Sequence, residues 1–208
     1  MAISLQDYEY SGDELSHSHA YLFPILLKIL ADRPVGPIFE LGCGNGTTAA
    51  MLAERGYAMT GVDPSSTGMA IAQRTCPTCH LECGSSDEDL AARFGRFPIV
   101  ISLEVAEHVY APATYAKAIF DLLEPGGIAI VSTPYHSYFK NLALALTGSM
   151  DSHFTALWEG GHIKFWSRET IRMLFETKGM TEIGFHRVGR FPTLAKSMVS
   201  VFRKAAEG

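Results

Sequence analysis

A short glycine-rich segment near the start of the chain has the composition of a ligand-binding loop. Residues 38–47 read Ile-Phe-Glu-Leu-Gly-Cys-Gly-Asn-Gly-Thr, which gives the spacing G-x-G-x-G. A dinucleotide-binding loop would read G-x-G-x-x-G and would need a glycine where this chain has Thr47. Glu40, two residues before the first glycine, would repel a pyrophosphate and attract a cationic amine. The loop therefore favours a nucleoside that carries an ammonium group.

Further polar residues follow at positions that suit the rest of such a ligand. Asp63 comes 23 residues after Glu40, and a carboxylate there could accept hydrogen bonds from both hydroxyls of a ribose. Taken alone, Asp63 before Pro64 would be an ordinary turn residue at the end of a strand. Ser86 and Asp87 could contact an adenine, although Ser-Ser-Asp also begins helices.

A second cluster, with the spacing E-x-x-E-H, could act on a second substrate. Glu104, Glu107 and His108 follow an apolar run, and His108 is a natural general base because the unperturbed pKa of imidazole is near neutrality. One alternative is that Glu107 and His108 only cap a local turn. Another is that Glu104, Glu107 and His108 hold Mg²⁺ or Mn²⁺ and that His162 completes the site. The spacing leaves these alternatives open.

The elements that must position these residues follow from hydrophobic periodicity. Short apolar runs alternate with helical patterns, as in a parallel sheet with crossover helices. We expect strands at 37–41, 57–62, 81–84, 97–103 and 128–132, then an antiparallel pair at 181–188 and 197–203. We expect helices around 22–30, 47–55 and 115–123, a turn at 125–127, and a helix that Ser167 caps and that ends near Gly179. The predicted fold class is α/β, a seven-stranded mixed sheet with helices on both faces and a terminal antiparallel hairpin.

The chain is expected to form one domain over residues 1–208, with two elaborations. Residues 1–34 would form a lid and a helix, and residues 135–166 a substrate cap, because a long irregular connection inside a compact domain is usually functional. The aromatic residues that could line an apolar pocket in the cap are Tyr135, Tyr138, Phe139, Phe154, Trp158 and Phe165. The residues of the lid that could close over a ligand are Tyr8, Tyr10, His17, His19 and Tyr21. For both sets the alternative is ordinary packing.

Composition limits the classes of partner and compartment. Of 208 residues, 47% are hydrophobic and 19% charged, which excludes a disordered chain. The net charge of −5 and a pI near 5.9 make a nucleic-acid partner unexpected. The longest apolar stretch, 20–30, contains Lys28 and is too short to span a bilayer, and the N-terminus has no secretion signal. We therefore expect a cytoplasmic protein that acts on a small molecule.

The four cysteines are expected to be ordinary thiols. Cys43, Cys76, Cys79 and Cys83 are too few to staple a domain of this size, and a large core needs no disulfides. The Cys76–Cys79 pair with His80 suggests zinc, but a second close pair is missing.

Several motifs in this order resemble one enzyme family. They are 40–46, 61–63, the strand ending at 102–104, 123–127, the run 104–109 and the run 161–168. Together they resemble class I S-adenosylmethionine-dependent methyltransferases and are similar to the branch that contains ubiquinone-biosynthesis O-methyltransferases. The family usually has Asp where this chain has Pro98, a position that is mainly structural.

The resemblance implies a Rossmann-like fold, S-adenosyl-L-methionine as cofactor, and O-methylation of a phenolic or other hydroxylated metabolite. The residues that would bind the cofactor are Glu40, Gly42, Cys43, Gly44, Gly46, Asp63, Pro64, Ser86, Asp87, Ser102 and Leu103. The E-x-x-E-H cluster with His162 resembles the metal site of terminal-ribose RNA methyltransferases. Metal-dependent 2′-O-methylation of an RNA end is therefore one alternative, and a non-catalytic protein that binds the cofactor is another.

Overall fold

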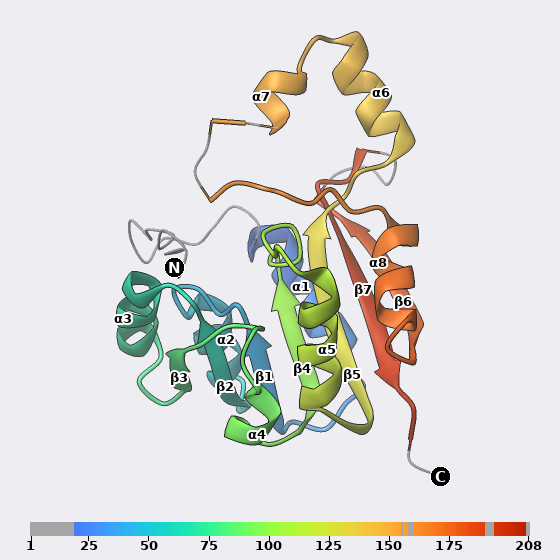
Figure 1. The fold of residues 1–208 in the computed structure, drawn as a ribbon. Helices are drawn as coiled ribbons and strands as arrows, with labels where there is room; N and C mark the ends of the chain where they lie inside the picture. Colours follow the sequence, from blue (N-terminus) through green and yellow to red (C-terminus); the bar gives the residue numbers. More distant parts are fainter. Residues whose placement is uncertain (1–18, 155, 158–159, 190–193, 207–208) are drawn as a thin grey trace, which may run out of the picture.

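The computed structural model describes residues 19–154, 156–157, 160–189 and 194–206, and it has the expected fold (Figure 1). A seven-stranded mixed sheet has the strand order β3-β2-β1-β4-β5-β7-β6. Its strands are β1 (Pro37–Leu41), β2 (Ala58–Asp63), β3 (His80–Cys83), β4 (Phe97–Leu103), β5 (Leu123–Pro134), β6 (Met180–Val188) and β7 (Ser197–Lys204). The first five strands are parallel, and β7 pairs antiparallel with both β5 and β6. The predicted Rossmann-like sheet with a terminal hairpin is confirmed.

Helices cover both faces of the sheet. They are α1 (His19–Leu30), α2 (Thr47–Ala53), α3 (Ser66–Thr75), α4 (Leu90–Phe94), α5 (Pro112–Leu122), α6 (Tyr138–Leu146), α7 (Met150–Phe154) and α8 (Arg168–Glu176). Buried side chains of α1, α2 and α3, such as Leu26 and Leu52, form one core with the sheet. Those of α4, α5 and α8, such as Tyr115 and Phe175, form the core on the other face. The near-continuous burial of β4 and β5 follows from this double cover.

The glycine-containing turn at 125–127 lies inside a strand rather than before one. β5 starts at Leu123, which pairs with Phe97, and the register then shifts so that Ile128 pairs with Ile99. The exposed residues 124–126 and the buried Gly127 take up this irregularity, and Gly126 has a φ of 78°. Turn residues are thus used here for a bulge.

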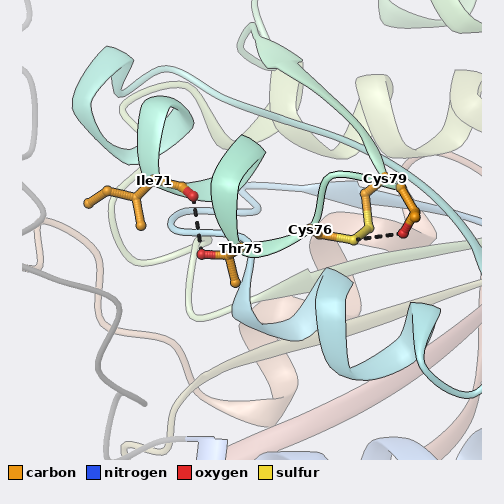
Figure 2. Close-up of a disulfide and its surroundings, with 5 residues drawn as sticks. Ile71, Thr75, Cys76 and Cys79 are labelled. Atoms are coloured by element: carbon orange, nitrogen blue, oxygen red, sulfur yellow. Dashed lines mark hydrogen bonds between the residues drawn. A yellow bond between two sulfur atoms is a disulfide. The ribbon is translucent and has the colours of Figure 1, made fainter.

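The prediction of ordinary thiols at Cys76 and Cys79 is wrong, because the two form a disulfide at the end of α3 (Figure 2). Their Cα atoms lie 5.3 Å apart, within the range that a disulfide spans. Cys76 is buried in the core, and in the last turn of α3 the Thr75 hydroxyl donates to the carbonyl of Ile71 (3.1 Å; Figure 2). A disulfide between residues three apart can form even in a domain with a large core. The prediction of free thiols relied on core size and therefore failed. Cys43 and Cys83 are free thiols.

The predicted cap contains α6 and α7, which project from the end of the sheet where β5 ends (Figure 1). No residue of α6 is buried, and Tyr138 and Leu146 are largely exposed. Trp158 and the lid residues Tyr8, Tyr10 and His17 lie outside the described residues. Among the residues described, no helix combines the length and the apolar character needed to cross a bilayer.

Candidate functional site

The glycine loop connects β1 to α2 at the carboxyl end of the parallel strands. The amides of Gly42 and Cys43 both donate to the carbonyl of Val62 (2.8 and 3.0 Å), which fastens the loop to β2. Gly46 caps α2 with a φ of 77°, and a Cβ atom there would lie 2.9 Å from the Cα of Ala72. A side chain at Gly46 would therefore be both strained and in collision with α3.

Asp63 holds the loop from the end of β2. Its Oδ2 accepts a hydrogen bond from the amide of Gly44 (2.9 Å), and its Oδ1 accepts one from the amide of Ser65 (2.9 Å). Burial nonetheless raises the pKa of Asp63. Asp63 thus stabilises the turn at the end of β2, which was the alternative role expected from the sequence. Pro64, the next residue, is exposed. Each carboxylate oxygen has a second lone pair, so contact with a ribose stays a prediction.

Glu40 lies beside Asp63 and is 2% exposed. Its Oε2 atom has no hydrogen-bond partner in the described part of the chain. Burial and then the charge of Asp63 raise the pKa of Glu40 to about 8, and a hydrogen bond with the Thr48 side chain opposes this only in part. Two buried carboxyl groups with an unused oxygen are costly unless a cation joins them. The site therefore fits a ligand with an ammonium group, such as the amino-acid end of S-adenosyl-L-methionine.

The remaining predicted cofactor residues are spread around this loop. The Ser102 hydroxyl is buried and donates to the carbonyl of Leu41 (2.8 Å), so it links β4 to β1. Leu103 is half-buried at the end of β4. Ser86 and Asp87 line a cavity of about 220 Å³ with residues of α4 and α5, and no residue of the glycine loop lines it. A contact of Ser86 or Asp87 with adenine stays a prediction.

Glu104 has an unusual backbone and an anchored side chain. It is the one non-glycine residue of the described chain with a positive φ, 55°. Its Oε1 accepts a hydrogen bond from the Ser132 hydroxyl (2.7 Å), and its Oε2 accepts one from the Ser197 hydroxyl (3.0 Å). Burial raises the pKa of Glu104 to about 7 although these bonds lower it. The two serines therefore fix the direction of a carboxyl group at the end of β4.

Glu107, His108 and His162 come together as predicted, but without Glu104. One potential ligand atom from each of the three lies within 4.8 Å of the others, and Glu104 is outside this group. Glu107 is 1% exposed, and neither of its carboxylate oxygens has a well-aligned hydrogen-bond partner among the described residues. Burial, and then the charge of Glu104, raise the pKa of Glu107 well above its usual range.

The two histidines of this group are held in the neutral state at pH 7. Their ring centroids lie 5.0 Å apart. Burial lowers the pKa of His108, and backbone hydrogen bonds with Gly160 and Gly161 oppose that shift. Burial and then the neighbouring His108 lower the pKa of His162 to about 4. Neutral imidazole is the form that a general base and a metal ligand both require.

An aromatic cluster formed by residues of the cap lies near His162, whose pKa is affected by His136 and His153. The His136 ring stacks on Phe154 at 5.9 Å and meets the edge of Phe165 at 5.2 Å, and His153 lies 5.7 Å from His136. Lys140 donates to the carbonyl of Tyr135 (3.0 Å). Two of the predicted cap residues, Phe154 and Phe165, are thus in contact with each other and with imidazoles at this end of the site.

Sequence reasoning missed five polar residues that complete this region: Ser132, His136, Lys140, His153 and Ser197. The two serines carried a signal for their position but not for their role, because each is a small polar residue next to apolar residues near one end of a predicted strand. β7 runs antiparallel to β5, so its first residue lies at the carboxyl edge of the parallel strands. The histidines and the lysine lie in a segment without clear periodicity.

Comparison with known proteins identifies the family. A family model described as a methyltransferase domain matches residues 15–182. The chain is 31% identical over 153 residues to a ubiquinone biosynthesis O-methyltransferase of Dinoroseobacter shibae, which covers 70% of this chain and 60% of that protein. A protein of the same name from a Caulobacter species is 34% identical over 116 residues, 54% of this chain and 46% of its own length. The chain thus spans about half the length of these curated relatives.

Solved structures share the fold at low sequence identity. The PH0226 protein of Pyrococcus horikoshii has a TM-score of 0.72 at 17% identity and covers 93% of this chain and 92% of its own. Magnesium protoporphyrin IX methyltransferase of Synechocystis, solved with bound S-adenosylhomocysteine, has a TM-score of 0.64 at 18% identity over 88% of this chain and 81% of its own. The extent of the family match and the shared fold together show that this chain belongs to the class I S-adenosylmethionine-dependent methyltransferases.

Proposed function

We propose that this protein transfers a methyl group from S-adenosyl-L-methionine to an oxygen of a phenolic or otherwise hydroxylated small molecule. The observation that carries the proposal is the buried Glu40 carboxyl beside Asp63, just before the glycine loop, with one oxygen to which no described residue hydrogen-bonds. The names of the curated relatives support an oxygen acceptor. The net charge of −5 argues against a nucleic-acid acceptor.

On this proposal, the chain binds the cofactor with the loop 42–46, Glu40 and Asp63, while the cap encloses the acceptor. The cofactor supplies a methyl group on a sulfonium, which is already activated. The protein must therefore align the acceptor oxygen, remove its proton and exclude water. Phe154 and Phe165 provide apolar surface for the acceptor beside the imidazoles.

His108 is the residue we propose as general base. It is half-buried and neutral at pH 7, and the unprotonated nitrogen of a neutral imidazole can accept the proton of the acceptor hydroxyl. Burial and the charge of Glu104 raise the pKa of Glu107, which favours its neutral form, and Glu107 would help to keep the imidazole in place.

A metal ion is the competing route, supported by the convergence of Glu107, His108 and His162. Mg²⁺ or Mn²⁺ would bind the ionised form of Glu107, so binding would release a proton. Glu104 would then support the site from outside, since both of its oxygens accept hydrogen bonds from serines. This route would also suit an RNA-end acceptor.

The deciding experiment has two stages. Thermal unfolding with S-adenosylhomocysteine should raise the melting temperature, and NAD should not, because only a ligand that binds the native state stabilises it. Stabilisation by NAD alone would refute the proposed cofactor. Hydroxylated metabolites and short RNAs are then screened with methyl-labelled cofactor, with and without a chelator. Label in a metabolite despite the chelator supports the base route, and loss of label that Mg²⁺ or Mn²⁺ restores supports the metal. Transfer to RNA alone, or to no acceptor, would refute the small-molecule proposal.

A further inference from the structure

The first turn of α1 does more than continue an apolar helix. Leu22 and Leu26 of α1 are buried in the core against the sheet. His19, the first residue of α1, and Tyr21 each hydrogen-bond to a hydroxyl side chain, and each of those side chains hydrogen-bonds to a carboxyl group of the site. One rigid helical turn is thus connected to two separate acidic side chains.

The first connection runs from Tyr21 to Glu104. The Tyr21 hydroxyl lies 3.2 Å from the Ser197 hydroxyl, and Ser197 Oγ lies 3.0 Å from Glu104 Oε2. A serine hydroxyl has one proton, and an ionised Glu104 can only accept. Ser197 therefore donates its proton to Glu104, and Tyr21 must donate to Ser197. Only a residue with a donor at position 21 can complete this chain.

The second connection runs from His19 to Glu40. His19 Nε2 lies 3.2 Å from Thr48 Oγ1, and the Thr48 side chain hydrogen-bonds to Glu40. By the same reasoning, Thr48 donates to an ionised Glu40, so His19 serves as the donor to Thr48 through Nε2. One hydroxyl then orients each carboxylate, and a side chain of α1 hydrogen-bonds to that hydroxyl.

Glu104 precedes a residue that packs on the glycine loop, and its backbone conformation needs external support. Its neighbour Val105 fills the space over the glycine loop, because a Cβ on Gly42 would lie 2.4 Å from Val105 Cγ2. A non-glycine residue with a φ of 55° is strained and persists only where its surroundings hold it. Ser132 holds Glu104 by its backbone amide and its carboxylate, and Ser197 holds the other oxygen.

We propose that the first turn of α1, through Tyr21–Ser197 and His19–Thr48, positions Glu104 and Glu40 to bind the cationic end of the cofactor. His19 and Tyr21 are positioning residues in this arrangement, because they act through Ser197 and Thr48. The inference rests on the proposed function in one respect, namely that the site binds this cofactor. It adds Glu104 to the binding groups and makes α1 a determinant of cofactor affinity.

The test is calorimetric titration with S-adenosylhomocysteine, which needs no acceptor. Tyr21→Phe keeps the ring and removes the donor, and it should weaken binding about three- to tenfold, the range for one lost hydrogen bond. Ser197→Ala and His19→Phe should do the same. Ser197→Thr keeps a hydroxyl and should stay within about twofold of the wild type. Tyr57→Phe, a matched loss of a hydroxyl in the same core, directly before β2, should leave the affinity unchanged.

A second comparison separates positioning from general stability. Glu104→Gly removes the carboxylate while accepting the positive φ. In that background Tyr21→Phe should have no further effect on affinity, because the group that it positions is gone. Full additivity of the two changes would overturn the proposal, as would unchanged binding in both Tyr21→Phe and Ser197→Ala while the wild type binds. Failure of the wild type itself to bind would instead refute the proposed function.

Discussion

The two ends of this site are built in different ways. The cofactor end is compact: the loop 42–46, Glu40 and Asp63 come from two adjacent parallel strands, and backbone amides hold them at 2.8–3.0 Å. The acceptor end is formed by residues that are far apart in the sequence. His108 follows β4, His162 precedes α8, and helix α6 of the cap has no buried residue. Its side chains meet through ring contacts of 4.9–5.9 Å.

This difference indicates which property each end controls. Buried carboxyl groups in a fixed loop are preorganised for one cation, which suits a cofactor that does not vary. A cap with little buried surface can change its sequence without disturbing the core. We therefore expect changes at the cofactor end to alter affinity and folding together, and changes at the acceptor end to alter rate or specificity alone.

The largest expected effect is at the acceptor end. His108→Ala should lower the methyl-transfer rate by about a hundredfold or more, because it removes the proton acceptor. Affinity for S-adenosylhomocysteine should stay within about twofold, since cofactor binding is assigned to the other end. Single-turnover rates and calorimetry measure the two quantities. A rate equal to that of the wild type, with or without Mn²⁺, would remove His108 from the mechanism.

At the cofactor end, Glu40→Gln should have the opposite profile. It keeps the shape of the side chain but loses the negative charge, so affinity for S-adenosylhomocysteine should fall about 10- to 100-fold. Calorimetry at pH 8 or above, where Glu40 can ionise, gives the clearest contrast. Binding as tight as that of the wild type would show that the ammonium group lies elsewhere.

The same substitution should stabilise the ligand-free protein at high pH. The pKa of Glu40 is raised from 4.5 to about 8 in the folded state, so its favourable contribution is complete below pH 4.5 and is lost as the pH rises through 8. Gln does not titrate. Between pH 5 and pH 9, the free energy of unfolding of Glu40→Gln should therefore rise relative to that of the wild type by about 4 kcal/mol. Parallel pH profiles in urea titrations would contradict the burial of a strained carboxyl group at this position.

The smallest effect should come from the outer surface of the cap. Leu146 in α6 is 79% exposed, so Leu146→Ser should change the free energy of unfolding by no more than about 0.5 kcal/mol. Leu122→Ser in α5, where the side chain is fully buried, is the matched contrast and should cost at least about 2 kcal/mol. Equal losses in urea denaturation would mean that α6 packs against the body of the protein.

The same difference between the two ends determines how much of the fold and of the site could be predicted from the sequence. The meeting of the glycine loop, Glu40 and Asp63 at one edge of the sheet was readable, because these residues lie in ten consecutive positions and at the end of the next strand. Strand-to-helix geometry then fixes where they meet. The parallel sheet and the hairpin were readable from periodicity. The roles of Ser132 and Ser197 were not, because they depend on two strands becoming neighbours across 65 residues of sequence. The expectation for Cys76 and Cys79 failed for a different reason, since core size does not forbid a bridge between residues three apart.

The place of β7 in the sheet has a consequence for how the protein comes to be made. β7 is the last strand in sequence, yet it lies between β5 and β6 rather than at an edge. During synthesis, β6 emerges before β7, the strand that joins it to the sheet. The edge of β6 therefore stays unpaired until β7 has been made. When β7 inserts between β5 and β6, Ser197 reaches Glu104. The site is therefore complete only after this strand has paired. We expect nascent chains that end before β7 to be prone to aggregation and unable to bind the cofactor, and pairing across such a sequence distance should be a slow step in folding.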